Sequence, residues 1–263
     1  MSNSLRFFIT FLLFISLPVM SFCEKIVSGE TKSLGNGTVS SWVKISDDGK
    51  PQSIGITITE DALKGLPGPN DAGAIKLTVF PDISTFEYVL SLPKEASLTP
   101  FTHISINWNP VGHPPECYAM QHFDFHFNMN TPEERETITC LGDDTLRVYK
   151  TPSPELIPKD YMTAPMTGEG RMGCHWFDPN SSEFHGMFSK TLIYGFYDGK
   201  MNFIEPMITK DFLEAKPVTN ITAEIKQPQV YPQAGKYYPT SYTVQYKPDT
   251  KEYVVSLDGL TLR

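Results

Sequence analysis

The run from His122 to Phe127 constrains the fold more than any other segment of the chain. It reads His-Phe-Asp-Phe-His-Phe, so polar residues alternate strictly with phenylalanines. A period of two predicts a β-strand whose successive side chains point to opposite faces. The phenylalanines can fill a hydrophobic core, while His122, Asp124 and His126 share the other face. Imidazole and carboxylate groups on one face predict a metal site or a proton-transfer site.

Proline and glycine, 22 and 18 residues, are spread along the whole chain and separate short alternating segments. This pattern predicts a mainly β fold, a sandwich or barrel of antiparallel sheets. We expect only two short helices, one starting at Thr131 and one over Thr209–Ala215. Residues 150–170 lack periodicity and predict a long loop, a candidate lid. The expected strands are Thr38–Ile45, Ile54–Thr59, Ile75–Phe80, Phe86–Leu92, His103–Trp108, Gln121–Met129, Gly173–Phe177, Thr191–Tyr197, Lys200–Glu205, Asn220–Lys226, Ser241–Tyr246 and Tyr253–Leu257.

Residues 1–23 have the features of a secretory signal peptide: a short positive start, an apolar run too short to span a bilayer, and a cleavage signal. We therefore expect an exported protein, periplasmic or secreted, whose mature chain is a single β-rich domain of residues 24–263. A lipoprotein anchor on Cys23 is the alternative, and the bulky Phe22 before it disfavours that interpretation.

Charge and hydropathy exclude two classes of partner. The chain has 22 Lys and Arg against 30 Asp and Glu, a net charge of −8. An acidic chain without a basic stripe is a poor nucleic-acid binder. No segment after the signal peptide is long and apolar enough to span a membrane. The partner is then an unidentified small molecule or protein.

Three cysteines follow the signal peptide: Cys117, Cys140 and Cys174. An exported chain usually oxidises its thiols, and an odd number allows at most one internal disulfide. We favour Cys117 with Cys140. Cys174 precedes His175, so on a strand it points to the opposite face and is expected to be a small buried side chain.

The spacing of a β-strand limits how His122, Asp124 and His126 can act together. Neighbours on one face are about 6.6 Å apart, and the two histidines are about 13 Å apart. One ion can therefore use one neighbouring pair, either His122 with Asp124 or Asp124 with His126. The third group would orient a ligand, unless a bulge bends the strand.

Further ligands must come from elsewhere in the chain. His113 lies in a proline-stiffened loop directly before the His/Asp strand and could reach its start. His175 is on a short predicted strand flanked by glycines. His113 could instead be an ordinary histidine of a surface loop.

Glu205 is the remaining candidate, and a hairpin positions it. Asp198-Gly199 predicts a two-residue turn, which pairs Tyr197 with Lys200 and Leu192 with Glu205. Glu205 then ends an otherwise apolar face, where a carboxylate must be paired, protonated or bound to a metal. The alternative is that the strand ends at Ile204 and Glu205 turns outward before Pro206.

The candidate metal ligands are thus His122, Asp124, His126, His175, Glu205 and His113. Zinc suits this set of nitrogen and oxygen ligands best. Copper is less well supported, because the methionines are scattered. An open coordination position would allow a metal-dependent hydrolase or lyase. The alternative is a non-enzymatic, stress-related binding or structural module, in which the same cluster is a buried hydrogen-bond network.

Six motifs follow one another along the chain: Ile106-Asn107-Trp108-Asn109-Pro110, Gly112-His113-Pro114-Pro115, residues 122–127, Gly173-x-His175-Trp176, Ile193-Tyr194-Gly195-x-Tyr197-Asp198-Gly199-Lys200 and residues 203–209. In this order they resemble the motifs of a family of exported bacterial proteins of uncharacterised function. Its founding member is a thermophile protein under the control of an extracytoplasmic-stress sigma factor. The resemblance is strongest over residues 100–215 and implies a mainly β fold and assembly into homo-oligomers, but no reaction.

Overall fold

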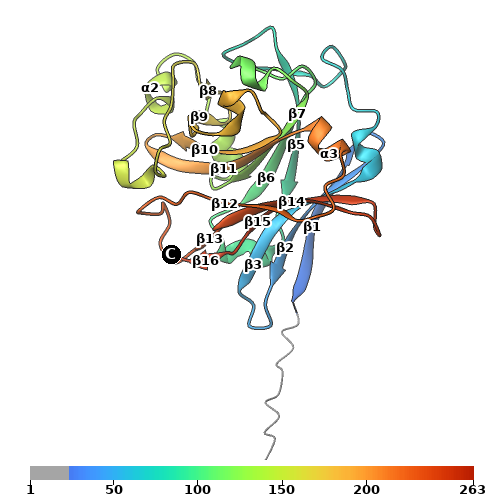
Figure 1. Cartoon of the computed structure of the whole chain (residues 1–263). Coiled ribbons are helices and arrows are strands. Elements are labelled where there is room, and N and C mark those ends of the chain that lie inside the picture. Colours follow the sequence, from blue (N-terminus) through green and yellow to red (C-terminus); the bar gives the residue numbers. More distant parts are fainter. Residues whose placement is uncertain (1–23) are drawn as a thin grey trace, which may run out of the picture.

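The computed structural model describes residues 24–263, so the predicted signal peptide and Cys23 lie outside the described residues. The described chain is mainly β, as the sequence predicts. Two antiparallel sheets pack face to face, and a small third sheet pairs β13 (Tyr237–Tyr238) with β16 (Thr261–Leu262). Figure 1 shows the two large sheets as a lower and an upper layer.

The lower layer is a six-stranded sheet formed by both ends of the described chain. Its C-terminal strands insert beside the N-terminal ones, because β15 pairs with β3. In spatial order the strands are β1 (Lys25–Leu34), β2 (Gly37–Ile45), β3 (Pro51–Thr59), β15 (Glu252–Asp258), β14 (Ser241–Lys247) and β12 (Ile221–Glu224).

The upper layer is an eight-stranded sheet curled into a half-barrel. The predicted His/Asp strand is β7 and lies near its centre, between β6 and β11. In spatial order the strands are β4 (Ile75–Lys76), β5 (Ser84–Ser91), β6 (His103–Asn109), β7 (His122–Asn128), β11 (Lys200–Thr209), β10 (Lys190–Tyr197), β9 (Gly173–Trp176) and β8 (Gly168–Glu169).

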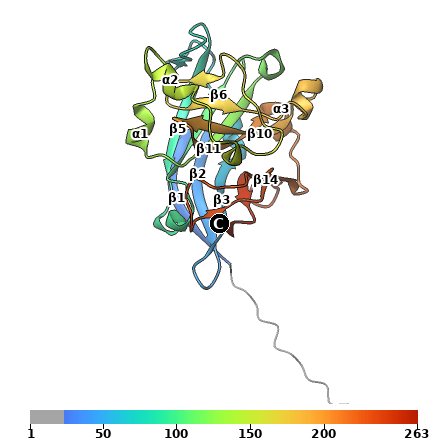
Figure 2. The ribbon, with the colours of Figure 1, turned by 90° about the vertical axis from the view of Figure 1, so that its left-hand side faces the viewer.

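Both faces of β7 are buried, for different reasons. Phe123, Phe125 and Phe127 are fully buried in the core between the two sheets. Burying a phenylalanine contributes roughly 1.5–3 kcal/mol, so this face alone is a substantial part of the core. His122 and His126 face away from the six-stranded sheet, yet they are also buried. Loops and short helices lie over that face of the upper sheet (Figures 1 and 2).

Three short helices occur among the described residues, one more than expected. The helix predicted from Thr131 is α1 (Pro132–Glu136), and its capping box is complete. The second predicted helix is α3 (Lys210–Glu214). The unpredicted one is α2 (Asp144–Val148). None of these helices is long and apolar enough to cross a membrane.

Several strand predictions differ from the structure, and the two-residue strands β8, β13 and β16 were not predicted from the sequence. The expected strand Ile75–Phe80 stops at Lys76. Beyond it, the Glu169 carboxylate accepts hydrogen bonds from the backbone N–H groups of Thr78 and Val79, at 2.7 and 3.4 Å. These two N–H groups therefore bond to a side chain and not to a neighbouring strand. Another difference is β1, which the sequence did not predict because it is a largely exposed edge strand with few apolar residues.

A β-bulge changes the predicted hairpin of β10 and β11. Tyr197 faces Lys200 and Phe196 faces Met201, as expected, but Gly195 then faces Phe203. Asn202 is the extra residue. Its side chain donates a hydrogen bond to the carbonyl oxygen of Met172, at 2.5 Å. All later residues of β11 are therefore moved to the opposite face from the one predicted.

The favoured disulfide is wrong, because Cys117, Cys140 and Cys174 are all free thiols. Cys140 and Cys174 belong to the main core, whereas Cys117 packs against a separate small cluster on the other side of the upper sheet. Cys174 is buried, as expected, and its thiol lies 3.0 Å from the hydroxyl of Thr163.

His103 makes the fold sensitive to acid. Burial, together with the charge of Arg135, lowers the pKa of His103 to about 4. Its value in the unfolded chain is about 6.5. Below pH 6.5 the unfolded chain therefore binds a proton that the folded chain does not bind. This group lowers the free energy of unfolding as the pH falls from about 6.5 to about 4.

When the pH falls from 7 to 4.5, the free energy of unfolding should decrease in both proteins. We expect the decrease to be about 2–3 kcal/mol smaller in the His103→Gln variant than in the parent. Urea unfolding at both pH values measures the difference. The His185→Gln variant is the control, because His185 is exposed. Equal losses in the parent and in His103→Gln would contradict the assignment.

Candidate metal centre

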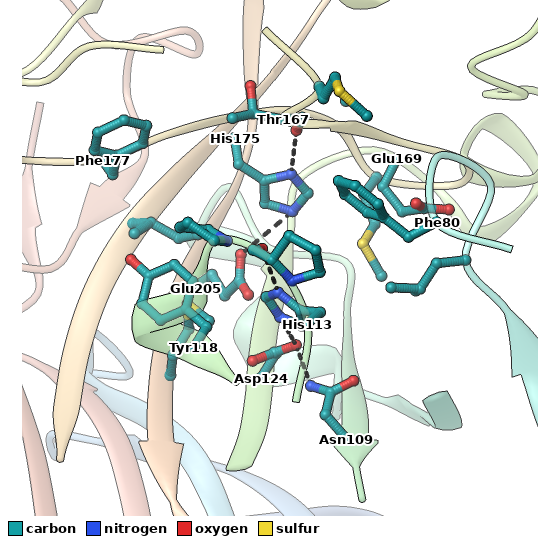
Figure 3. Close-up of a pocket in the computed structure, with 18 of the residues that line it drawn as sticks. Phe80, Asn109, His113, Tyr118, Asp124, Thr167, Glu169, His175, Phe177 and Glu205 are labelled. Carbon is teal, nitrogen blue, oxygen red and sulfur yellow. Dashed lines mark hydrogen bonds and ion pairs between the residues drawn. The ribbon is translucent and has the colours of Figure 1, made fainter. Parts of the chain in front are cut away.

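A pocket of about 470 Å³ opens over the polar face of the upper sheet. Its floor contains Asp124 of β7 and Glu205 of β11. His113 and His175 enter from the walls, as Figure 3 shows. The rest of the wall is mostly apolar, with side chains such as Phe80, Phe177, Met166 and Pro165. Residues 164–169 of the predicted loop border the pocket.

The six candidate ligands lie in two groups of three. The first group is His113, His122 and Asp124, and the second is His126, His175 and Glu205. Within each group the candidate ligand atoms are all within 4.8 Å of one another. Each group combines one fully buried histidine of β7, one partly exposed histidine of the pocket wall and one buried carboxylate.

The first group is tightly packed. The Nε2 atoms of His122 and His113 are 3.1 Å apart. His122 Nε2 is 3.1 Å from Asp124 Oδ1, and His113 Nε2 is 3.6 Å from Asp124 Oδ2. Bonds of 2.0–2.1 Å in a tetrahedral zinc site separate two ligand atoms by about 3.3 Å. The spacing of the three atoms therefore fits a single zinc-sized ion.

The backbone fixes which nitrogen of each ring carries a proton. His122 Nδ1 lies 2.6 Å from the carbonyl oxygen of Met120, and His113 Nδ1 lies 2.9 Å from that of Pro114. A carbonyl only accepts, so both Nδ1 atoms donate and both Nε2 atoms of the neutral rings carry lone pairs. Two lone pairs 3.1 Å apart repel each other unless a proton or a cation lies between them. Backbone contacts of this kind are typical of metal-binding histidines.

Asn109 supports the carboxylate of the first group. Its Nδ2 donates a hydrogen bond to Asp124 Oδ2, at 2.6 Å (Figure 3). Burial alone would raise the pKa of Asp124, but in the metal-free protein the charge of a protonated His122 and hydrogen bonds from protonated His113 and His122 outweigh burial and hold that pKa well below its usual range. Asp124 is therefore a buried anion at neutral pH and favours cationic partners.

The second group is looser and has fewer hydrogen bonds. His126 Nε2 is 3.4 Å and His175 Nε2 is 3.7 Å from Glu205 Oε2. Burial, then the charge of Asp124, raises the pKa of Glu205 well above its usual range. Burial lowers the pKa of His126 to about 3. The ring of Phe203 packs against both histidines of the group.

The bulge and Gly195 together place the second group. Without the bulge, Glu205 would point into the main core with Phe196 and Met201. The shifted strand instead puts Glu205 opposite Ile193, on the pocket face. A Cβ atom on Gly195 would lie only 2.0 Å from the Phe203 ring, so a glycine is required there. The alternative in which the strand ends at Ile204 is wrong, because β11 continues to Thr209.

The structure also separates the three polar residues of β7. His122 and Asp124 are neighbours in one group, as strand spacing allows. His126 does not orient that pair but joins residues of β9 and β11. His185, a residue not chosen as a ligand, is exposed and belongs to neither group.

Three supporting residues were not singled out from the sequence. Asn109 is on β6, where polar residues alternate with apolar ones as on β7, and that alternation was a usable signal. Tyr118 packs against the rings of His113 and His122, and its hydroxyl donates to the buried Glu183, at 3.2 Å. No local sequence pattern predicts the pairing of Tyr118 with Glu183, because 65 residues separate them in the chain.

Comparison with known proteins gives one match. Residues 46–108 match the family described as "TTHB210-like: Hypothetical protein TTHB210". The match agrees with the expected similarity to an uncharacterised family. The matched segment, however, precedes most of residues 100–215, the part of the chain in which the motifs suggested that similarity. The match covers less than half of the chain and includes none of the six candidate ligands. No curated protein and no solved structure matches the chain.

We expect the Asn109→Ala substitution to destabilise the metal-free protein by about 1–2 kcal/mol more than Asn107→Ala. Asn109 donates to a charged carboxylate, and such bonds contribute about 1.5–3 kcal/mol, against about 0.5–1.5 kcal/mol for neutral ones. Asn107 is a matched control, because it is equally buried on the same strand but donates only to the Thr85 hydroxyl, at 3.3 Å. Urea unfolding at pH 7 measures both variants. A smaller loss for Asn109→Ala would contradict the role given to this bond.

Proposed function

We propose that this protein binds a zinc ion through His113, His122 and Asp124, and that it is a zinc-dependent hydrolase or lyase acting on a small molecule in the pocket. One observation carries the proposal: two backbone-oriented histidines direct the lone pairs of their Nε2 atoms at each other, 3.1 Å apart, beside a buried carboxylate. A cation satisfies all three groups at once.

Three protein ligands suit a catalytic rather than a structural zinc site, since the fourth coordination position is left for a small molecule. When bound with an open position, zinc lowers the pKa of a water molecule toward 7 and polarises carbonyl groups. The protein supplies orientation. His122 and Asp124 come from one rigid strand, Asn109 holds the carboxylate, and the apolar wall around His113 limits the access of bulk water.

The pocket favours a neutral substrate with an apolar body. Its described lining includes the carboxylates of Asp124, Glu169 and Glu205 but no lysine or arginine. In this lining a phosphate or carboxylate substrate would have no cationic side chain to pair with and would depend on bound metal alone. Aromatic, methionine and proline side chains on the wall suit an apolar body.

A hydrogen-bond network without metal is the second candidate function, that of a non-enzymatic binding or structural module. A proton shared between His113 and His122 would make their 3.1 Å contact favourable and supports this alternative. Within the first group, such a network leaves the buried Oδ1 atom of Asp124 without a hydrogen-bond partner. Since buried polar groups are costly when unpaired, the metal proposal explains more of the site.

The proposal places this chemistry outside the cytoplasm, on the basis of the signal-peptide pattern in residues 1–23. Expression of the full chain in a Gram-negative host should give a periplasmic protein that begins at Glu24. N-terminal sequencing of that fraction measures the cleavage site. An intact N-terminus in the cytoplasmic fraction would contradict export, and a lipid on Cys23 would show the anchored alternative.

Protein purified without a histidine tag should contain zinc, and the His122→Gln variant should lose one equivalent per chain. The physical reason is that Gln cannot replace a neutral imidazole ligand fixed by the Met120 carbonyl. Elemental analysis measures the metal, and thermal unfolding with and without a chelator measures its contribution to stability. The zinc-loaded protein should hydrolyse 4-nitrophenyl acetate faster than His122→Gln does, and it should not hydrolyse 4-nitrophenyl phosphate.

The matched control is His103→Gln. His103 is as buried as His122 and lies on the same face of the same sheet, but in neither group. This variant should keep the metal content of the parent. A parent protein without stoichiometric metal, and with unchanged melting in a chelator, would overturn the metal proposal. Iron in place of zinc would overturn the choice of metal.

A further inference from the structure

The second group of side chains has a set of unpaired atoms that the first site does not explain. Both ring nitrogens of His126 and the Oε2 atom of Glu205 are buried and have no hydrogen-bond partner. The side chains of His126 and Glu205 are 1 % and 2 % exposed. A buried polar atom without a partner loses the hydrogen bonds it makes to water, so native structures almost always provide one. Two of these atoms, His126 Nε2 and Glu205 Oε2, lie 3.4 Å apart and indicate a missing ligand between them.

The third member of the group is oriented toward the same point. His175 Nδ1 lies 2.7 Å from the carbonyl oxygen of Thr167 and donates to it (Figure 3). The Nε2 atom of the neutral ring therefore carries a lone pair and lies 3.7 Å from Glu205 Oε2. This arrangement repeats the one at His113 and His122, where backbone carbonyls also orient the rings.

A proton on Glu205 does not complete this group. A protonated carboxyl has one O–H and can donate to one histidine only. The distances from Glu205 Oε2 to the two Nε2 atoms, 3.4 and 3.7 Å, are also longer than a normal hydrogen bond. They are close to the separation of about 3.3 Å expected between two ligands of one zinc-sized ion. A cation, unlike a proton, can bind His126 Nε2, His175 Nε2 and Glu205 Oε2 together.

We propose that His126, His175 and Glu205 form a second binding site for a divalent cation of the zinc class. The two sites are neighbours. Asp124 of the first and His126 of the second are two residues apart on β7, a spacing of about 6.6 Å. Asp124 and Glu205 both line the floor of one pocket, so a substrate there would meet two cations. The second site stands on its own atoms and does not require the first.

The test is the zinc stoichiometry of the purified protein after dialysis, measured by elemental analysis. We expect two equivalents per chain in the parent and one in the Glu205→Gln variant. Glu87→Gln is the matched control, because the Glu87 side chain is also buried, at 6 % exposed, but pairs with Arg135 and lies outside both groups; it should keep two equivalents. Cadmium-113 NMR of the cadmium-loaded protein should show two resonances in the parent. Glu205→Gln and His122→Gln should each lose a different one.

The outcomes separate the two proposals. A parent with one equivalent that Glu205→Gln retains would overturn the second site and leave the first. One equivalent lost in both Glu205→Gln and His122→Gln would show a single shared site, which also overturns the inference. Two equivalents retained in Glu205→Gln would place the second ion elsewhere. The circular dichroism spectrum of each metal-free variant checks that it is folded, and the NMR of Glu205→Gln shows directly whether the other site is intact.

Discussion

The fold depends on a strand that is buried on both faces. The phenylalanines of β7 fill the core between the two sheets, and this packing holds the strand at the centre of the larger sheet. His122, Asp124 and His126 are then forced to one side, where loops cover them. A buried polar face is stable only when its groups are paired. Asn109, the backbone carbonyls and the wall histidines provide some of that pairing, and a bound cation would provide the rest.

The site also depends on one irregularity in the neighbouring hairpin. Side chains alternate with a period of two, so a single extra residue reverses the face of everything after it. Asn202 is that residue, and it moves Glu205 from the main core to the pocket. Gly195 allows the shift by leaving room for the Phe203 ring, which in turn packs against His126 and His175. One bulge therefore positions a carboxylate and supports both histidines of its group.

The parts that could be predicted from the sequence are those with a local physical cause. The alternation of residues 122–127 predicts a strand with two different faces, and strand spacing predicts a separation of His122 from His126, which do lie in different groups. Tyr197 and Lys200 pair as the Asp-Gly turn requires. The bulge was missed although a glycine inside a strand often marks one. The partners of His126, which are His175 and Glu205, lie 49 and 79 residues away in the chain, and no local pattern reveals such contacts.

The two groups have the same construction, and in both of them a histidine of the sheet lies next to a histidine that a pocket loop holds in place. In each, β7 supplies a fully buried histidine, whereas the second histidine is held through the carbonyl of a loop residue, Pro114 or Thr167. Ions bound in these groups would connect the loops to the rigid sheet. Binding to the folded chain alone stabilises it in proportion to the logarithm of the ligand concentration over its dissociation constant. Part of that free energy would go into ordering the loops, so the shape of the pocket and its affinity for metal would depend on each other.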